Sequence, residues 1–396
     1  LMRPPETLNA DTEVSATHST ASESGRLRVL HVYKTFYPDT TGGVEVVLSQ
    51  LMRNLSSMGI ESRLFVLSSE PTPSPAEMFG AQIFRLQTSV SLSSNPMSLR
   101  ALLAFRKHVH WADIIHYQFP WPFADLLHLM HGTARPSLVS YQSDIVRQKH
   151  LMRVYRPLMD RFLGSVDRIC ATSASYSQTS PVLPRFKSKV KVIPNGLDQI
   201  TLPHAPVSLR ERWRFQLGQG FFLFVGVLRY YKGLHTLISA AQFVSGRIVI
   251  AGTGSDELNL KSQAAALGIQ NVSFVGHVTD EDKAALLELC GVFVFPSHLR
   301  SEAFGMSLVE ASMFSRPMIS CEIGTGTSFV NLHGVTGLTV PPENPRALAS
   351  AMCNLYQNDD LRKKMACAAR QRYEALFTGE RMASAYLAQY QELMAL

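Results

Sequence analysis

The sequence predicts an α/β protein built from two doubly wound, Rossmann-like domains. Both halves of the 396-residue chain alternate short apolar strands with amphipathic helices, which is the pattern of parallel sheets covered by helices. Between the halves, residues 197–215 carry Pro203 and Pro206 with little periodicity and are expected to form a linker. We therefore expect an N-terminal domain over 27–196 and a C-terminal domain over 216–376.

Composition and charge narrow the class of protein. A hydrophobic fraction of 46% suffices for two cores, and five scattered cysteines without a Cys-x-x-Cys pair fit a reduced cytoplasm. The longest uncharged apolar run, Phe221 to Leu228, is far shorter than a membrane span, and the N-terminus shows no secretion signal. Residues 1–26 are rich in Ser, Thr and Glu and are expected to be a disordered tail. A net charge of +7 permits an acidic partner, but no nucleic-acid-binding signature accompanies it, so nucleic acid is not expected.

The N-terminal domain is expected to open with a parallel βαβ unit. A buried strand over Leu27–Tyr33 leads into a polar loop, a helix follows from Val44 to Gly59, and Ser62–Ser68 is the next strand. Gly42 and Gly43 end the loop where ligands bind beside the first strand of an open α/β sheet. A glycine pair can also simply make the turn.

The alternation continues along the chain. In the first half we expect a helix around 99–110, strands at DIIHYQF and SLVSYQS, and further elements of the alternation at AQIFRLQ and LLHLM. Residues 168–173 and 189–196 close this half. In the second half we expect strands at FFLFVGVL, RIVIAGTG, NVSFVG, GVFVFPS, PMISC and LTV, a helix from Asp280, and final helices over 360–377 and 380–396.

A basic amphipathic stretch runs from Asp144 to Arg168. Six Arg and Lys residues interleave there with large apolar ones. Such a stretch can lie on an anionic membrane surface, or it can be an ordinary surface helix with basic outer residues. The sequence leaves both readings open.

The most informative stretch is PSHLRSEAFGMSLVEA, residues 296–311. It joins an apolar strand to a helix expected over Phe304–Phe314. Such a junction leaves free backbone N–H groups at the positive end of the helix dipole, here on Phe304, Gly305, Met306 and Ser307. This end is therefore a candidate site for a phosphate.

Two carboxylates bracket that junction, Glu302 and Glu310, eight positions apart. A carboxylate beside a phosphate site repels the anion but accepts hydrogen bonds from hydroxyl groups, so Glu302 suits a sugar and Glu310 a second diol such as a ribose. Sugar, diphosphate and ribose together describe a nucleotide sugar.

Two cations follow the first strand of the second half, which ends at Gly226. Arg229 and Lys232 would stabilise a departing diphosphate, whereas a basic helix start without that role opposes the dipole. The string Asp280-Glu281-Asp282 has the form of a DxD metal motif, but Thr279 before it and the apolar residues after it indicate a helix start with acidic first-turn residues. We expect no metal ion and no other cofactor.

The string SEAFGMSLVEA resembles the Glu-x7-Glu signature of glycosyltransferase family 4, retaining enzymes whose GT-B fold faces two Rossmann-like domains across a cleft. Within that family, bacterial O-antigen mannosyltransferases and A-band rhamnosyltransferases look similar in VYKTFYPDTTGGVE, YQSDIVRQK, PSHLRSEAFG and CEIGTGTSF. The resemblance implies metal-independent transfer of mannose or D-rhamnose from a GDP-sugar to a lipid-linked polysaccharide. It also implies a cytoplasmic enzyme held peripherally on the inner membrane.

The resemblance extends to further residues. Gly42 and Gly43 would leave room for the donor, and the backbone of Gly276, His277 and Val278 falls where the family grips the nucleobase. Residues 377–396 would pack back on the N-terminal domain. Candidate catalytic residues in YQSDIVRQK are Asp144 and Gln142, the latter standing where the family usually has a histidine.

Two alternatives remain. The chain could be another GT-B enzyme that uses a UDP-sugar, either a transferase or an epimerase. It could also be a catalytically weak nucleotide-sugar-binding scaffold, because Gln142 cannot take up a proton.

Overall fold

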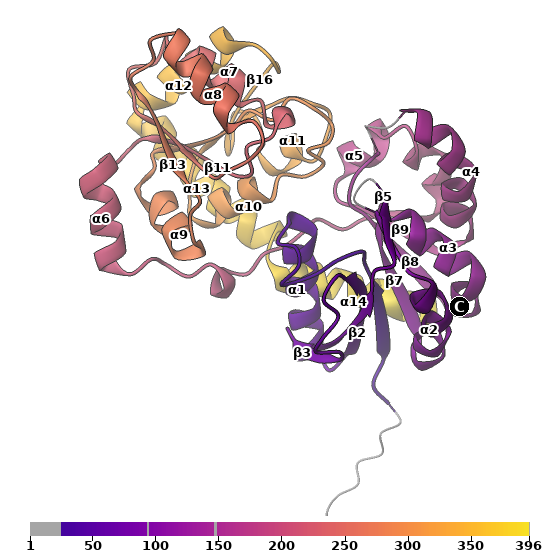
Figure 1. The fold of residues 1–396 in the computed structure, drawn as a ribbon. Coiled ribbons are helices and arrows are strands. Elements are labelled where there is room, and N and C mark those ends of the chain that lie inside the picture. The colour runs from indigo at the N-terminus through magenta and orange to yellow at the C-terminus, as the bar shows by residue number, and fades with distance from the viewer. Residues whose placement is uncertain (1–24, 93–94, 146–148, 396) are drawn as a thin grey trace, which may run out of the picture.

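The computed structural model of the chain describes residues 25–92, 95–145 and 149–395. It consists of two α/β domains joined by two stretches of chain that run close together (Figure 1). The tail expected over residues 1–26 lies, apart from Gly25 and Arg26, outside the described residues. The predicted fold class, two doubly wound Rossmann-like domains, is confirmed.

The N-terminal domain contains an eight-stranded sheet in which β1 is central and only β3 runs antiparallel to its neighbour. From edge to edge the strands are β10 (Val190–Val192), β9 (Arg168–Ala171), β8 (Ser137–Tyr141), β7 (Ile114–Phe119), β1 (Arg28–Val32), β2 (Glu61–Ser68), β4 (Ala81–Gln87) and β3 (Ala76–Met78). The sequence missed β3 and a separate hairpin formed by β5 (Val90–Leu92) and β6 (Asn95–Met97). These short strands carry too few residues to show a periodicity.

Helices cover both faces of this sheet. One face packs against α1 (Gly43–Ser57), and the other packs against α2 (Leu99–Trp111), α3 (Pro122–His131) and α4 (Lys149–Ser165). The short helix α5 (Ala174–Thr179) follows β9 at the end of the sheet that faces the C-terminal domain (Figure 1). A one-turn η1 (Gly132–Ala134) ends α3, and η2 (Leu183–Lys189) leads into β10.

The C-terminal domain contains a six-stranded parallel sheet. Its order is β13 (Val272–Gly276), β12 (Ile248–Ala251), β11 (Phe222–Val225), β14 (Val292–Phe295), β15 (Met318–Cys321) and β16 (Gly337–Val340). The connecting elements are η4 (Tyr230–Lys232), α7 (Leu234–Ala241), α8 (Glu257–Ala266), α9 (Asp280–Leu289), α10 (Met306–Met313), α11 (Thr327–Val330), α12 (Pro345–Gln357) and α13 (Asp359–Leu376). In both sheets the first strand lies between the second and the fourth parallel strands of its domain, counted along the chain, as in a doubly wound fold.

The expected linker is only partly irregular. Its start contains η3 (Gln199–Thr201), but Val207–Leu217 forms helix α6, whose Trp213 is buried in the core of the C-terminal domain. Trp213 also donates a hydrogen bond from its ring nitrogen to Asp282 over 2.8 Å. The prediction missed this helix because most of its side chains are polar and exposed, so its apolar period is weak.

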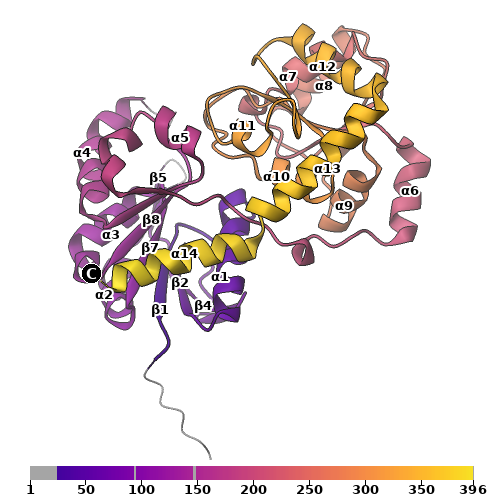
Figure 2. The same cartoon turned by 180° about the vertical axis from the view of Figure 1, so that it is seen from behind.

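The final helix, α14 (Gly379–Met394), leaves the C-terminal domain and lies along the N-terminal one (Figure 2). Its Met382, Tyr386, Tyr390 and Leu393 are buried in one cluster with side chains of α1, β1, β7 and β8. The helix therefore shares the α1 face of the sheet and completes the core of the first domain with residues from the end of the chain.

The two stretches that cross between the domains are tied together. The backbone N–H of Leu197 donates to the carbonyl of Phe377 over 2.9 Å, and the carboxylate of Asp198 accepts from the N–H of Gly379 over 2.8 Å. At Gly196 a Cβ atom would lie 2.2 Å from the carbonyl oxygen of Thr378, so only glycine permits this approach. We call residues 196–198 with 377–379 the crossing.

The apolar face of α4 is used inside the domain. Tyr155, Met159, Phe162 and Leu163 are buried in its core, and Val154 is the one large apolar side chain of the described part of α4 that is strongly exposed. For these residues the ordinary surface-helix reading of the basic stretch accounts for the amphipathic pattern. No described helix of the chain is both long enough and apolar enough to span a bilayer.

Candidate active site

The C-terminal ends of β11 and β14 meet at the point where the strand order of the second sheet reverses. Ligands of open α/β sheets bind at such a switch point. The segment after β11 carries Gly226, Arg229 and Lys232, and the segment after β14 carries residues 296–302. The fold thus brings together two motifs that are some seventy residues apart in the sequence, as Lys232 and Glu302 show.

Lys232 and Glu302 form an ion pair at this point. The Lys232 ammonium donates to Glu302 Oε2 over 2.5 Å, and each side chain is only 12% exposed. Ser297 Oγ donates to the same carboxylate oxygen over 3.3 Å, and the ammonium lies 4.9 Å from the centre of the Phe295 ring. The partly desolvated lysine is thereby fixed beside the carboxylate that the sequence predicted to hold a sugar.

Gly233 allows the two loops to approach. It adopts φ +68°, and a Cβ atom there would lie 2.0 Å from the carbonyl oxygen of Pro296. His298 N–H in turn donates to the carbonyl of Tyr231 over 3.1 Å. The loop after β11 therefore packs directly on the loop after β14, which holds Lys232 and Glu302 in register.

Glu310 forms a second buried ion pair. Its Oε1 accepts from the ammonium of Lys283 over 2.8 Å, and Lys283 also contacts Asp280 at 3.0 Å. Burial lowers the pKa of Lys283, but the two carboxylates outweigh it and raise that pKa above its ordinary value. Lys283 lies in the first turn of α9, and it is a cation that the sequence analysis did not identify.

The helix of the central motif begins later than predicted. Gly305 is its N-cap with φ +87°, and α10 starts at Met306. Phe304 precedes this N-cap, so its backbone is not part of the helical first turn and the prediction was wrong on this point. Its side chain is buried and packs against Phe377. The N–H groups of Met306 and Ser307 remain in the first turn, where no intrahelical acceptor exists.

The glycine loop of the N-terminal domain faces this helix end. Gly43 is the first residue of α1, and a Cβ atom on it would lie 3.7 Å from Met306 Cγ. Met306 packs against the cores of both domains. The starts of α1 and α10 therefore oppose each other, as expected if both border one ligand.

Gly42 serves a different contact. A Cβ atom there would lie 2.6 Å from Oε2 of Glu45, whose other carboxylate oxygen accepts from Thr40 Oγ1 over 2.6 Å. Glu45 is buried although it is charged. Gly42 thus makes room for a carboxylate that ties the loop to the first turn of α1.

Charges of the C-terminal domain act on two side chains of the same loop, Lys34 and Tyr37. Burial lowers the pKa of Lys34, Glu45 opposes this, and the positive charge of Arg229 lowers the pKa further. Burial also raises the pKa of Tyr37, with Glu45 and Asp280 adding to the effect. Lys34 and Arg229 therefore bring two positive charges to the junction between the domains.

Asp144 joins the domains through Arg300. The guanidinium of Arg300 donates to Asp144 Oδ2 over 3.1 Å and to Thr179 Oγ1 over 3.1 Å. Asp144 Oδ1 accepts from Tyr141 over 3.0 Å and from Ser180 over 2.6 Å. Asp144 is thus fully engaged as a carboxylate, and it fixes the residue two positions before Glu302.

Gln142 belongs to a buried polar chain. Its amide nitrogen donates to Gln118 Oε1 over 2.9 Å, and its oxygen accepts from Asn195 over 3.2 Å. The amide nitrogen of Gln118 in turn contacts Nε2 of His116. Nδ1 of His116 lies 2.7 Å from the hydroxyl of Tyr390 on α14. Burial lowers the pKa of His116 well below its usual range, so the ring is neutral. The side chain of Gln142 is positioned by these neighbours at the end of β8.

Gly276, His277 and Val278 do not join this cluster. They lie at the end of the edge strand β13, two positions from β11 in the sheet. His277 is exposed, and the carbonyl of Gly276 accepts from the N–H of Gly252 over 2.7 Å. Any contact that these residues make to a donor would come from the edge strand β13, which β12 separates from β11.

Two family models match the chain. The model described as Glycosyltransferase Family 4 covers residues 41–199, and the model described as Glycosyl transferases group 1 covers residues 208–372. The chain belongs to glycosyltransferase family 4.

Relatives of this glycosyltransferase match over most of its length. It is 49% identical to the D-rhamnosyltransferase WbpZ of Pseudomonas aeruginosa, over 89% of this chain and 92% of the relative. It is 44% identical to O-antigen chain mannosyltransferase C of Escherichia coli, over 93% of this chain and 99% of the relative. The solved sucrose-phosphate synthase of Thermosynechococcus elongatus covers 93% of this chain and all of its own, with a TM-score of 0.76 at 20% identity. That likeness bears on the GT-B fold, as predicted from the sequence.

The acidic string of the glycosyltransferase at 280–282 starts α9. Thr279 accepts from the N–H of Asp282, and the Asp282 carboxylate accepts from the N–H and hydroxyl of Thr279, which together form a capping box. Asp282 also receives the bonds from Trp213 and Arg212. The prediction of a helix start here is confirmed. Among the described residues, no group of three or more His, Cys, Asp or Glu could hold a metal.

Three cations of the glycosyltransferase site escaped the sequence analysis: Lys34, Lys283 and Arg300. Lys283 and Arg300 bind Glu310 and Asp144, which lie 27 and 156 residues away in the sequence, so no spacing could reveal these pairs. Arg300 alone gave a local signal, because it stands within the motif two residues before Glu302.

Proposed function

We propose that this glycosyltransferase moves mannose or D-rhamnose from a GDP-sugar to a lipid-linked polysaccharide acceptor in O-antigen biosynthesis, with retention at the anomeric carbon and without a metal ion. The observation that carries the chemistry is the buried Lys232–Glu302 pair at the switch point of the second sheet. The names of the two relatives that match over most of both chains support the sugar and the pathway.

In this proposal the positive charge that the leaving group needs comes from side chains and backbone. The bond between the anomeric carbon and a phosphate oxygen breaks, and the electron pair stays on the diphosphate. Lys232, Arg229 and the first turn of α10 would stabilise that charge, because preorganised donors are most effective in a partly desolvated site. The acceptor hydroxyl oxygen forms the new bond on the face that the phosphate leaves, and its proton passes to a phosphate oxygen.

The carboxylates of Glu302 and Glu310 would accept hydrogen bonds from hydroxyl groups of the donor. Glu302 has one oxygen occupied by Lys232 and Ser297, and Oε1 has no partner among the described residues. Glu310 likewise has Oε1 bound to Lys283 and its other oxygen available. Each can therefore accept a hydrogen bond from a diol while its other oxygen stays bound to the paired lysine.

We also propose that the enzyme binds peripherally to the anionic inner membrane through the N-terminal domain. Large apolar side chains are exposed on the β5–β6 hairpin and on the first turns of α2, namely Val90, Leu92, Met97, Leu99 and Leu103. Exposed basic residues accompany them on α2: Arg100, Arg106 and Lys107. Apolar contact combined with attraction to anionic lipids is the chemistry of an interfacial helix.

The deciding experiment measures calorimetric binding of GDP, GDP-mannose and UDP with and without EDTA, on the wild type and on Glu310→Ala. The proposal expects EDTA to leave the affinities for GDP and GDP-mannose unchanged, and Glu310→Ala to bind both ligands more weakly. Preference for UDP would move the enzyme to the UDP-sugar class, and donor binding without transfer to any lipid-linked acceptor would favour a scaffold.

A separate test addresses the membrane. Flotation with vesicles of phosphatidylglycerol and phosphatidylethanolamine should recover the wild type, and Leu99→Asp with Leu103→Asp should reduce the recovered fraction. Val154→Asp on α4 is the matched control, because it is exposed but lies outside the proposed surface. Equal recovery of all three proteins would refute this surface.

A further inference from the structure

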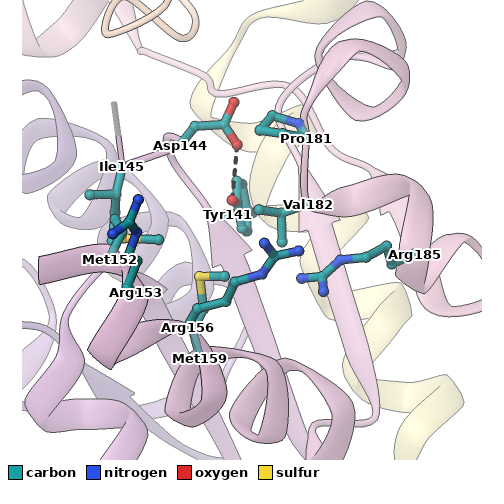
Figure 3. A pocket seen from close by; sticks show the side chains of 10 residues that line it. All are labelled: Tyr141, Asp144, Ile145, Met152, Arg153, Arg156, Met159, Pro181, Val182 and Arg185. Atoms are coloured by element: carbon teal, nitrogen blue, oxygen red, sulfur yellow. Dashed lines mark hydrogen bonds between the residues drawn. The ribbon is translucent and has the colours of Figure 1, made fainter. Parts of the chain in front are cut away.

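The N-terminal domain contains a pocket that the donor chemistry does not use. It has a volume of about 400 Å³ and lies between α4 and the start of η2 (Figure 3). Ten residues line it: Tyr141, Asp144, Ile145, Met152, Arg153, Arg156, Met159, Pro181, Val182 and Arg185. We call it the α4 pocket.

The lining of the α4 pocket combines positive charge with apolar surface. Three of the ten side chains are arginines, and most of the remainder are apolar. Figure 3 shows the guanidinium groups of Arg156 and Arg185 turned toward each other from the two sides, with Arg153 to the left of them beside Ile145 and Met152. Like charges that converge in this way repel each other unless an anion lies between them.

The charges around the pocket do not cancel. Asp160 pairs with Arg185 over 2.8 Å and approaches Arg156 at 3.7 Å, but it is one carboxylate against two guanidinium groups. Arg153 has no partner among the described residues. Asp144 is already paired with Arg300. The described walls therefore hold an excess of positive charge with the capacity to donate several further hydrogen bonds.

The pocket also borders the reaction site. Asp144 forms part of its wall and accepts the hydrogen bond of Arg300, which stands two residues before Glu302. A molecule in the pocket would thus lie beside the residue of the N-terminal domain that binds Arg300.

We propose that the α4 pocket binds the acceptor at the point where a phosphate joins its apolar chain. This inference rests on the proposed function, since it names a subsite for the lipid-linked acceptor. Arg153 and Arg156 bind the phosphate or diphosphate, because guanidinium groups match phosphate oxygens in geometry and charge. The apolar chain lies on the remaining lining, formed by Ile145, Met152, Pro181 and Val182.

The test measures binding of a water-soluble probe, farnesyl diphosphate, to the full chain by calorimetry. The probe should bind about tenfold more tightly than inorganic pyrophosphate, because it also buries apolar surface. Arg153→Glu combined with Arg156→Glu should weaken it by about tenfold or more, since each reversal removes a charge contact and adds a repulsion. Arg161→Glu is the matched control, because it is an exposed arginine of the same helix outside the pocket.

A second variant tests the apolar wall. Met152→Gln should reduce the preference for farnesyl diphosphate over pyrophosphate and leave pyrophosphate binding unchanged. Dihexanoyl phosphatidylglycerol, measured in parallel, distinguishes a prenyl diphosphate from an ordinary phospholipid, and an arginine-dependent signal with either one supports the pocket. Equal binding of pyrophosphate and farnesyl diphosphate would overturn the proposal, and so would unchanged binding by the double variant.

Donor binding is measured on the same proteins. The double variant should keep the GDP affinity of the wild type, because both arginines belong to α4 of the N-terminal domain whereas the Lys232–Glu302 pair belongs to the C-terminal domain. Displacement of farnesyl diphosphate by GDP would place the probe in the donor site and refute the pocket. Absence of any nucleotide binding would refute the proposed function. The effect of the arginine substitutions on farnesyl diphosphate binding would still show whether the α4 pocket binds the probe.

Discussion

Removal of Arg300 tests how the two domains are held around the reaction site. Its guanidinium makes two hydrogen bonds to the N-terminal domain, to Asp144 and to Thr179, each over 3.1 Å. Arg300→Ala deletes both. Asp144 Oδ1 keeps its hydrogen bonds from Tyr141 and Ser180, whereas Oδ2 loses the donor that Arg300 supplies.

The expected loss follows from the geometry. A hydrogen bond to a charged group contributes roughly 1.5–3 kcal/mol when shielded from solvent. The side chain of Arg300 is 29% exposed although that of Asp144 is only 5% exposed, so screening reduces the sum. We expect the closed arrangement to lose about 1–2 kcal/mol, which is a factor of roughly 5–30 in its population.

The population of closed molecules can be read by single-molecule fluorescence transfer between dyes on exposed positions of α1 and α13. A double-mutant cycle with Asp144→Asn isolates the energy of the pair. Arg346→Ala is the control, because that arginine stacks on Phe243 within its own domain, 3.8 Å from the ring centre. A distance distribution in Arg300→Ala that equals the wild type, with no coupling in the cycle, would refute the idea that this bond holds the domains together.

Three further predictions concern the crossing, a buried histidine and the second ion pair. Gly196→Ala should destabilise the enzyme strongly, because its Cβ would lie 2.2 Å from the Thr378 carbonyl oxygen; thermal unfolding measures this, and an unchanged midpoint would contradict it. His31 is fully buried with both ring nitrogens unpaired, and burial lowers its pKa to about 3. The stability that depends on its neutral form is present above about pH 6.5 and is lost as the pH falls toward 3, so His31→Leu should stabilise the protein at pH 7 by about 1 kcal/mol and flatten the acid limb of its urea unfolding; an unaltered limb would show that His31 does not titrate there. Lys283→Met should leave Glu310 as an unpaired carboxylate and weaken GDP binding without changing the fold, whereas unaltered affinity would separate this pair from the donor site.

Most regular elements were predictable because their signals are local. The strand AQIFRLQ was placed correctly at β4, and the helix expected from Val44 to Gly59 differs from α1 by one or two residues at each end. The parallel sheets followed from the alternation of strands and helices. The start of α10 was misplaced because Phe304 is apolar at a helical spacing, while the left-handed Gly305 behind it sets the true boundary.

The candidate site was predictable only in part. Glu302, Lys232 and Gly43 could be named from motifs, and the fold brings Lys232 to Glu302 and Gly43 to Met306. Their roles toward a donor stay predictions. The partners Lys283 and Arg300 depend on contacts between distant segments, and a sequence without structure carries no signal for such pairs.

The position of α14 has a consequence for the folding of the protein during its synthesis on the ribosome. The apolar face that Val47, Leu51 and Ile114 present is covered only when Tyr386 and Tyr390 have been synthesised, after the whole C-terminal domain. Until then the N-terminal domain would emerge with an exposed apolar strip, open to chaperones or to a second nascent chain. The order of synthesis thus makes the last helix of the chain the closing step for its first domain.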